Sequence, residues 1–312
     1  MINEQLYVIL FYKFHSIDNL EKFQKEHIDF CNDIAILGRI LVASEGINGS
    51  VSGTREQIDS YKKYITSLEG FNDVKFKEDS VLNHPFTRMQ VKIRDTLINI
   101  GRDVNISKKG KYIEPDELFK LYNDSAYGED FIIIDTRNDY EYKIGRFKDS
   151  IHLDIKTFRQ FPEALKKIEH MKDKKIITYC TGGIRCEKAT SFMIEQGFEN
   201  VYQLKDGILT YGKEYPDTFW EGKCFVFDKR MFSDINSDKS PITNCELCGT
   251  SSDLNRNCRN VNCDKLFISC VKCEKKFNGC CSKECHDELK QHFKEKAFIN
   301  QGRKASALQI ST

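Results

Sequence analysis

The residues best suited to chemistry in this sequence are a cysteine and the short loop that follows it. Cys180 begins the loop, Gly182 and Gly183 lie in its middle, and Arg185 and Cys186 close it. Paired glycines let the backbone turn tightly enough for several N–H groups to point at one atom. Such a loop stabilises a thiolate or a persulfide and lowers the pKa of the cysteine. We therefore expect Cys180 to be a sulfur nucleophile.

Two regular elements must hold this loop. A β-prone run at 175–179 leads into Cys180, and a helical run at 187–193 follows. A strand, a tight loop and a helix N-terminus direct the positive end of the helix dipole at the sulfur. The alternative is a buried structural cysteine in an ordinary turn, but such a turn does not need two glycines and an arginine at this spacing.

Two further residues of the loop each have two interpretations. Arg185 could hold an anion or the charge on sulfur, and we expect it to act with Cys180 in catalysis. The alternative is an ion pair with an acid such as Glu187 or Asp135. Cys186 could resolve an oxidised or persulfidated Cys180. We favour a small buried residue at the start of the helix.

Residues 111–222 alternate β-prone and helical runs, which predicts an α/β domain. The run 131–135 is continuously apolar, as expected for a parallel strand covered on both faces. Asp135, Arg137 and Glu141 follow at its carboxyl end and could contribute to the pocket floor. We favour a structural role for them, as a charge network that fixes the loop after the strand. Chemistry in such a domain lies at the carboxyl ends of the strands, which is where Cys180 falls.

Residues 1–105 carry a different pattern, with the order β-α-β-β-α-β. This order predicts a ferredoxin-like domain, and therefore an α+β fold beside the α/β domain. Thr54 is a suitable cap for the second helix. Asn48-Gly49 predicts a tight hairpin turn between the second and third strands. Together with Glu45 it could instead bind RNA or face the sulfur site.

Basic and aromatic side chains in this first domain could form an RNA-binding face. Charged helix faces are more often only solvated, so we keep that alternative open. The candidate phosphate contacts are Arg39, Lys62, Lys63, Lys75, Lys77, Arg88, Lys92 and Arg94. The candidate base-stacking residues are Tyr61, Tyr64 and Phe76.

Residues 223–312 form a cysteine-rich segment. Nine of the 13 cysteines lie between Cys245 and Cys285. Two Cys-x2-Cys pairs with further cysteines interleaved predict tetrahedral zinc–thiolate sites rather than an iron–sulfur cluster. The first expected site is Cys245, Cys248, Cys270 and Cys273; the second is Cys258, Cys263, Cys281 and Cys285; Cys280 and His286 are spare candidates.

The composition limits the classes of function. The chain has 312 residues and a net charge of +1, so no global field argues for a nucleic acid or a membrane, although a local basic patch remains open. No apolar run reaches transmembrane length, and the N-terminus lacks the features of a signal peptide. We expect a reducing, cytoplasmic location in which the cysteines are metal ligands or reactive thiols.

Four separated motifs resemble one known family, the rhodanese-like tRNA uridine hydroxylases (TrhO, or YceA). The resemblance covers essentially the whole chain in the same order, and its motifs are 43–49, 135–141, 180–189 and 207–209 with 222–228. Two departures, at 146–150 and Asp206-Gly207, lie outside the cysteine loop and affect local shape more than chemistry.

The resemblance implies hydroxylation of uridine 34, the wobble base of the tRNA anticodon, to 5-hydroxyuridine, with molecular oxygen as the oxidant. It implies that Cys180 is the reactive cysteine and carries a persulfide intermediate, which would require a sulfur donor. A plain rhodanese-type sulfurtransferase is the main alternative. A non-catalytic RNA-binding protein is the third, and an intact Cys180 and Arg185 argue against it. The sequence does not specify an oligomeric state.

Overall fold

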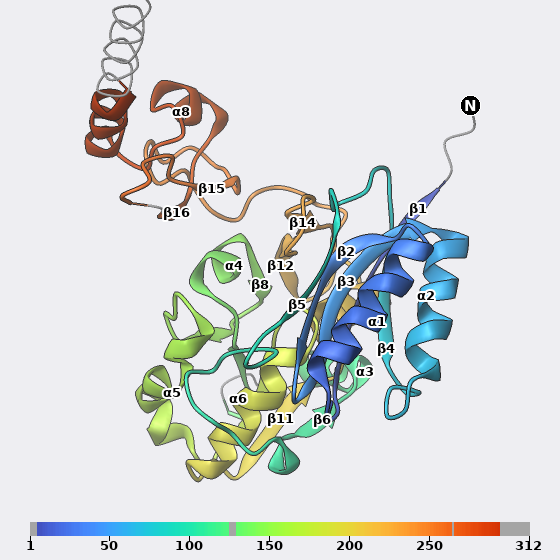
Figure 1. The fold of residues 1–312 in the computed structure, drawn as a ribbon. Helices are drawn as coiled ribbons and strands as arrows, with labels where there is room; N and C mark the ends of the chain where they lie inside the picture. Colours follow the sequence, from blue (N-terminus) through green and yellow to red (C-terminus); the bar gives the residue numbers. More distant parts are fainter. Residues whose placement is uncertain (1–4, 125–128, 264, 294–312) are drawn as a thin grey trace, which may run out of the picture. The chain divides into compact units, whose positions relative to one another are not determined.

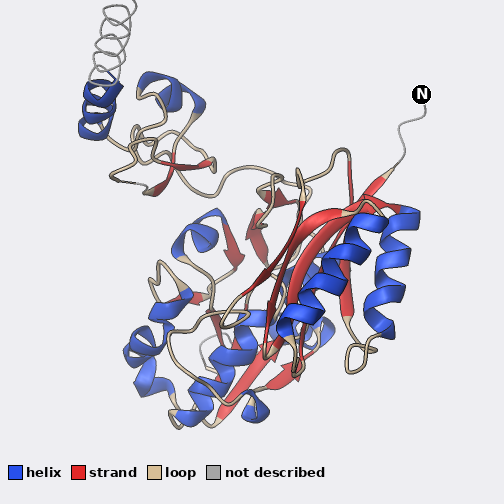
Figure 2. Cartoon of the chain, in the orientation of Figure 1, coloured by secondary structure: helices blue, strands red, loops and turns tan. Residues whose placement is uncertain are grey.

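The computed structural model describes residues 5–124, 129–263 and 265–293 (Figures 1 and 2). The chain divides into two compact units, residues 1–238 and 239–312, and each is described by itself. In the described ranges, no helix is both long enough and apolar enough to cross a membrane.

The first unit begins with a five-stranded sheet whose strand order is β4-β1-β3-β2-β5. The order of elements confirms the predicted ferredoxin-like βαββαβ domain, to which β5 adds an edge strand parallel to β2. The elements are β1 (Leu6–Phe14), α1 (Leu20–Asp33), β2 (Leu37–Ala43), β3 (Gly46–Thr54), α2 (Arg55–Ser67), β4 (Lys75–Val81) and β5 (Met89–Ile93).

The two faces of this sheet have different surroundings. Helices α1 and α2 cover one face (Figure 1), where Ile9 and Phe11 pack in one core with Ile58 and Tyr61. Because strand side chains alternate, the residues between them point to the other face. One registered row crosses that face from β4 to β5: Lys77, Leu10, Ser50, Arg39 and Gln90.

The hairpin between β2 and β3 is present, but the predicted Asn-Gly turn is wrong. Asn48 and Gly49 lie inside β3, and the chain turns at 44–45, just before Gly46. Gly46 has a φ of +140°, and a Cβ there would lie 2.0 Å from a backbone oxygen. A Cβ on Gly49 would lie 2.8 Å from the ring of Phe11. Both glycines are therefore explained by packing in the sheet.

A second five-stranded sheet has the order β6-β11-β10-β7-β9, and all its neighbouring strands are parallel. This confirms the predicted α/β domain. Its strands are β6 (Lys111–Ile113), β7 (Ile132–Asp135), β9 (Ile151–His152), β10 (Lys175–Tyr179) and β11 (Asn200–Leu204). Its helices include α3 (Pro115–Asp124), α4 (Asp139–Ile144), α5 (Phe161–Ala164), α6 (Ile184–Glu195) and α7 (Gly207–Glu214).

Two short antiparallel pairs complete the first unit. One joins β8 (Gly145–Phe147) to β12 (Trp220–Gly222), and the other joins β13 (Cys224–Phe225) to β14 (Phe232–Ser233). The loop between β13 and β14 is tied to β4, because Arg230 bonds both Asp228, at 2.6 Å, and Asp79, at 3.3 Å. The start of the cysteine-rich segment is thus fastened to the first sheet.

The second unit is small and rich in cysteine. An antiparallel pair, β15 (Asn255–Asn257) and β16 (Leu266–Ile268), precedes the short helix α8 (Val271–Lys276). Its apolar core is limited, and is built around Cys258, Phe267, Cys280 and Leu289. A core of this size needs additional cross-links to be stable.

Candidate active site

Cys180 lies where the chain leaves β10 and turns toward α6. The residue is 1% exposed, and the N–H of Gly183 donates to its sulfur at 3.1 Å. Gly183 has a φ of +101°, a conformation that glycine adopts without strain. The loop therefore has the form expected of it, with sulfur at the N-terminus of α6.

The carbonyls of this loop are bonded elsewhere. The N–H of Ile208 donates to the oxygen of Cys180 at 3.0 Å, and that of Leu209 donates to the oxygen of Thr181 at 3.2 Å. Gly207 makes this approach possible, because a Cβ there would lie 2.5 Å from the Cys180 oxygen. Since α7 binds the carbonyls, the N–H groups of the loop are left to face the sulfur.

The loop sets the protonation of two neighbouring thiols. Burial alone would raise the pKa of Cys180. The hydrogen bond with Cys186, the charge of Arg185, and the N–H groups of Arg185 and Gly183 outweigh it and lower the pKa of Cys180 to about 6. Burial, together with the hydrogen bond and negative charge of Cys180, raises the pKa of Cys186 well above its usual value. At neutral pH, Cys180 is the thiolate and Cys186 the neutral donor, in agreement with the buried position predicted for Cys186.

Arg185 is held by Glu141. Its two terminal nitrogens donate to the two carboxylate oxygens at 2.7 and 2.8 Å, and the hydroxyl of Thr181 donates to the same group at 3.3 Å. Arg185 does form an ion pair, as the alternative interpretation of the sequence predicted, but its partner is Glu141 and not Glu187 or Asp135. Arg185 therefore acts on the sulfur through its charge and its backbone N–H, with its guanidinium fixed in one place.

The acidic and basic residues after β7 form the predicted charge network. Arg137 is fully buried and donates to Asp135 at 2.6 Å and to the oxygen of Gly145, also at 2.6 Å. A buried pair of this kind fixes the loop after the strand, and breaking it would leave an uncompensated charge.

The first sheet forms a roof over the cysteine loop. The hydroxyl of Tyr12 donates to Glu187 at 3.0 Å and lies 2.8 Å from where a Cβ on Gly183 would be. Leu10 lies over Gly182, where a Cβ would approach it to 2.9 Å. Both side chains come from the face of β1 that is not covered by helices. The two glycines thus also make room for the neighbouring domain.

Two ion pairs fasten this roof. Lys77 bonds Asp206 at 2.6 Å, and Lys188 bonds Glu45 at 2.8 Å. Asp206 stands where the resemblance leads one to expect glycine, and it adopts a left-handed φ of +58°. The departure at this position therefore supplies a charge for Lys77. Glu45 anchors α6 and does not reach the sulfur in any recorded contact.

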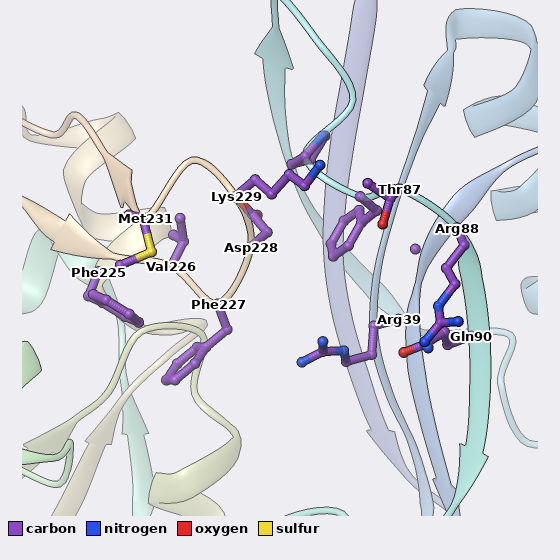
Figure 3. Close-up of a pocket in the computed structure, with 13 residues that line it drawn as sticks. Arg39, Thr87, Arg88, Gln90, Phe225, Val226, Phe227, Asp228, Lys229 and Met231 are labelled. Carbon is purple, nitrogen blue, oxygen red and sulfur yellow. The ribbon is translucent and has the colours of Figure 1, made fainter. Parts of the chain in front are cut away.

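Two hollows lie near the loop. A cavity of about 60 Å³ beside Thr181 is also lined by Leu10 and Ser50. A groove of about 550 Å³ (Figure 3) is adjacent to it, because Val226, Phe227 and Asp228 line both. The groove is lined by Arg39, Thr87, Arg88, Gln90, Phe225, Phe227, Lys229 and Met231, among others.

The predicted basic face is only partly one surface. Arg39 and Arg88 line the groove, whereas Lys62 pairs with Glu78 at 2.5 Å on the helical side. Base stacking by Tyr61 is wrong, because its ring is fully buried and its hydroxyl bonds His27 at 2.8 Å. Tyr61 lies on the apolar side of α2, where Ile58 and Ile65 are also fully buried.

Phe227 was missed as a site residue. It is 56% exposed, which is unusual for phenylalanine, and it stands between Phe225 and a run of charged residues. The sequence gives a weak signal only, because an alternating Phe-x-Phe run also predicts an ordinary strand.

The cysteines of the second unit gather into the two predicted groups. Cys245, Cys248, Cys270 and Cys273 form one, and Cys258, Cys263, Cys281 and Cys285 form the other, with the sulfurs of each group within 4.8 Å of one another. Four sulfurs bound to one zinc ion at about 2.3 Å lie about 3.8 Å apart. The recorded sulfur–sulfur distances are 3.6 to 3.7 Å.

Backbone N–H groups also point at these sulfurs. The N–H of Cys273 donates to Cys270 at 3.5 Å, and that of Cys281 donates to Cys258 at 3.4 Å. Such bonds orient and stabilise metal-bound thiolates. The donor set and its spacing therefore fit a zinc ion at each group, while Cys280 lies in the apolar core and His286 lies outside both groups.

Fold and loop together define a rhodanese-like protein with an added N-terminal domain. Family models agree: a UPF0176 acylphosphatase-like domain matches residues 6–97, a rhodanese-like domain matches 114–214, and a rhodanase C-terminal model matches 221–286.

Curated relatives define the family more narrowly. One from Cytophaga hutchinsonii is 41% identical over 281 residues and covers 89% of each chain. One from Bacillus licheniformis is 42% identical and covers 91% of this chain and 89% of its own. A third, from Staphylococcus saprophyticus, is 38% identical and covers 97% and 96%. All three are named tRNA uridine(34) hydroxylase, and the chain described here belongs to that family.

Proposed function

We propose that this chain is an oxidoreductase that hydroxylates uridine 34 of tRNA to 5-hydroxyuridine. Membership of the tRNA uridine(34) hydroxylase family supports the substrate and the reaction. The single structural observation that carries the proposal is the thiolate-stabilising loop at Cys180, placed under a second domain. A tRNA substrate would place the enzyme in the cytoplasm.

In this proposal Cys180 is the catalytic residue, and it reacts as a thiolate or as the persulfide formed on it. The N–H groups of the loop hold the negative charge on sulfur, and Cys186 keeps its proton. Arg185 adds a positive charge whose position Glu141 fixes. Molecular oxygen is the proposed oxidant, and a sulfur donor is required if the persulfide is the reacting form.

The cysteine-rich segment is proposed to bind two structural zinc ions. The eight ligands are those of the two groups, and zinc would cross-link a segment whose apolar core is small. We propose three domains with boundaries at 1–105, 111–222 and 223–312. Residues 224–233 pack with the first unit, so the zinc-binding part would begin after them.

A plain sulfurtransferase is the second candidate, because the loop would stabilise a persulfide whatever the acceptor. The roof over the loop argues for a large acceptor. Leu10 and Tyr12 belong to a second domain that covers the cysteine loop, and a basic groove lies beside it. Transfer to a small acceptor does not require such a second domain.

The deciding experiment is a complementation test. A bacterial strain without uridine-34 hydroxylation would express the wild-type chain, Cys180→Ser or Cys224→Ser, and its tRNA nucleosides would be measured by mass spectrometry. Cys224 is an equally buried thiol of the same unit whose pKa burial raises to about 12, so it is a matched control. We expect 5-hydroxyuridine-derived nucleosides with the wild type and Cys224→Ser only.

Absence of these nucleosides with the wild-type chain, at normal expression, would exclude the hydroxylase. Full rescue by Cys180→Ser would instead remove Cys180 from the reaction. Thiosulfate:cyanide transfer by the purified wild type without any tRNA hydroxylation would favour the sulfurtransferase.

A further inference from the structure

The inference concerns the groove of Figure 3 and the exposed ring of Phe227 in it. The loop that carries this ring is held rigidly. The N–H of Val226 donates to Met231 at 2.9 Å, and that of Met231 donates to Asp228 at 3.0 Å. Arg230 then bonds Asp228 at 2.6 Å. A rigid, exposed aromatic ring binds a planar partner at low cost in conformational entropy.

The ring is connected to the reactive loop. The guanidinium carbon of Arg185 lies 5.6 Å from the centre of the Phe227 ring, within the range of a cation–π contact. Arg185 is itself fixed by Glu141 and belongs to the loop that Cys180 begins. Anything stacked on Phe227 is therefore adjacent to the machinery around the sulfur.

The opposite wall of the groove is basic. Figure 3 shows Arg39 extending from β2 into the space that faces Phe227. Arg39 and Lys229 are exposed, and among the described residues neither side chain has an ion-pair partner. Asp228 on the same loop is neutralised by Arg230. The uncompensated charge in the groove is therefore positive.

The strand pairing of the first sheet fixes how far Arg39 lies from the residue that covers the cysteine loop. Arg39, Ser50 and Leu10 are consecutive members of the row that crosses β2, β3 and β1. Leu10 lies over Gly182 in the cysteine loop. Neighbouring strands are about 4.8 Å apart, so Arg39 is rooted about 10 Å along the sheet from the residue that covers the loop. This is the scale of a nucleotide and its neighbour.

We propose that the groove is the RNA-binding subsite beside the reactive sulfur, where Phe227 stacks on a nucleobase and Arg39 and Lys229 contact the flanking phosphates. An aromatic platform with free cations on either side is the usual means of holding single-stranded RNA, and an anticodon loop offers unstacked bases. The proposal rests on the proposed tRNA substrate and adds the residues that hold it.

The first test measures the affinity of the full chain for an anticodon stem-loop RNA that carries uridine at position 34, by fluorescence anisotropy. Loss of a stacked base weakens binding by about 1–3 kcal/mol, so Phe227→Ala should bind about 5- to 160-fold more weakly, while Phe227→Trp should bind normally. Phe293→Ala is the matched control, because Phe293 is 50% exposed and does not line the groove.

The second test measures the salt dependence of the same binding. Arg39→Gln and Lys229→Gln should each reduce the slope of log K against log salt by about 0.7 to 0.9, as expected for one lost phosphate contact. Lys63→Gln, on α2 and on the helical side of the sheet, should leave the slope unchanged. The melting temperature should remain that of the wild type in Arg39→Gln, Lys229→Gln and Lys63→Gln.

Unchanged affinity in Phe227→Ala, or an equal loss in Phe293→Ala, would overturn the inference and leave the groove to a protein such as a sulfur donor. The outcome is separable from that of the proposed function. If the wild type hydroxylates tRNA and Phe227→Ala binds normally, only the subsite is wrong. If the wild type binds RNA through Phe227 and hydroxylates nothing, only the reaction is wrong.

Discussion

A single sulfur atom is the point at which the interactions of the loop converge. Burial opposes a charge on Cys180, and three kinds of group overcome it: a neighbouring thiol, a fixed guanidinium and backbone N–H donors. Each is contributed by the seven residues that begin with Cys180. The sequence could therefore predict a loop that stabilises the Cys180 thiolate, because the groups that lower its pKa are local.

The protonation of Cys180 can be tested by alkylation. With a folded-state pKa of about 6, against about 9 for a free thiol, Cys180 is a thiolate above pH 6 and loses reactivity below it. We expect its rate of reaction with iodoacetamide to rise with a midpoint near pH 6, while Cys186, whose pKa is raised, stays unreactive at neutral pH. Trypsin cleaves after Arg185, so mass spectrometry resolves the two thiols on separate peptides.

A midpoint near pH 9 for Cys180 would show that the loop does not stabilise the thiolate. Equal rates for both cysteines at neutral pH would contradict the assignment of the shared proton to Cys186.

Removing Arg185 tests its two effects separately. Arg185→Gln should raise the pKa of Cys180, and it should also lower the free energy of unfolding by about 3–5 kcal/mol, because the buried Glu141 carboxylate loses its ion-pair partner. The double variant Glu141→Gln/Arg185→Gln should recover most of the stability but not the low pKa. Urea unfolding and the alkylation profile measure the two quantities. A double variant with the wild-type profile would exclude an electrostatic role for Arg185.

At the scale of elements, the strand–loop–helix unit supplies only some of the side chains around Cys180. The face of the first sheet that no helix covers supplies others, because it places Leu10 and Tyr12 against the loop. Periodicity predicted the strands and helices of both domains because alternation and the helical repeat are properties of neighbouring residues. It could not predict which domain faces the loop, because that contact joins residues 175 positions apart.

The hairpin between β2 and β3 is a second case in which neighbouring residues alone do not predict the structure. Asn48-Gly49 has the composition of a turn, yet both residues pair with β1 and β2 inside β3, where the ring of Phe11 leaves no room for a side chain on Gly49. A local rule cannot detect a ring that comes from another strand. Phe227 was not predicted as a candidate for the same reason, because its contact with Arg185 and its place in the groove with Arg39 join residues distant in the sequence.

Gly46 provides a test of the turn as observed. Gly46→Ala combines a left-handed φ of +140° with a contact of 2.0 Å to a backbone oxygen, and should lower the free energy of unfolding by more than about 2 kcal/mol. Gly197→Ala is the control, because its φ is +86° and nothing lies within 4 Å of the added Cβ, so it should cost about 1 kcal/mol. Equal losses in urea unfolding would contradict the steric account.

At the scale of the whole molecule, the chain combines two kinds of stabilisation. The first unit has large apolar cores, whereas the second has a small one and two groups of four cysteines. Spacing predicted both groups, since the two Cys-x2-Cys pairs make up the first group and four of the remaining cysteines of the segment make up the second.

Metal content tests the second unit. We expect two zinc ions per chain by elemental analysis, one in Cys273→Ser, and one in Cys263→Ser, because each variant loses a ligand of a different group. Cys280→Ser is the control; it lies between ligands in sequence but packs in the apolar core, and should retain two. No zinc in the wild type purified without chelator, or loss of zinc in Cys280→Ser, would contradict the assignment.

Helix α6 lacks the solvent-facing side that most helices have. Nine consecutive residues, 185–193, are buried, because one side of the helix packs on the core of its own domain and the other meets the first sheet. A helix with a solvent-facing side tolerates substitutions along that side, and α6 has no such side over residues 185–193. Deleting a single residue from it would rotate everything beyond by about 100° and present each charge to the wrong neighbour. Within the family, the length of this helix should therefore be harder to change than its composition.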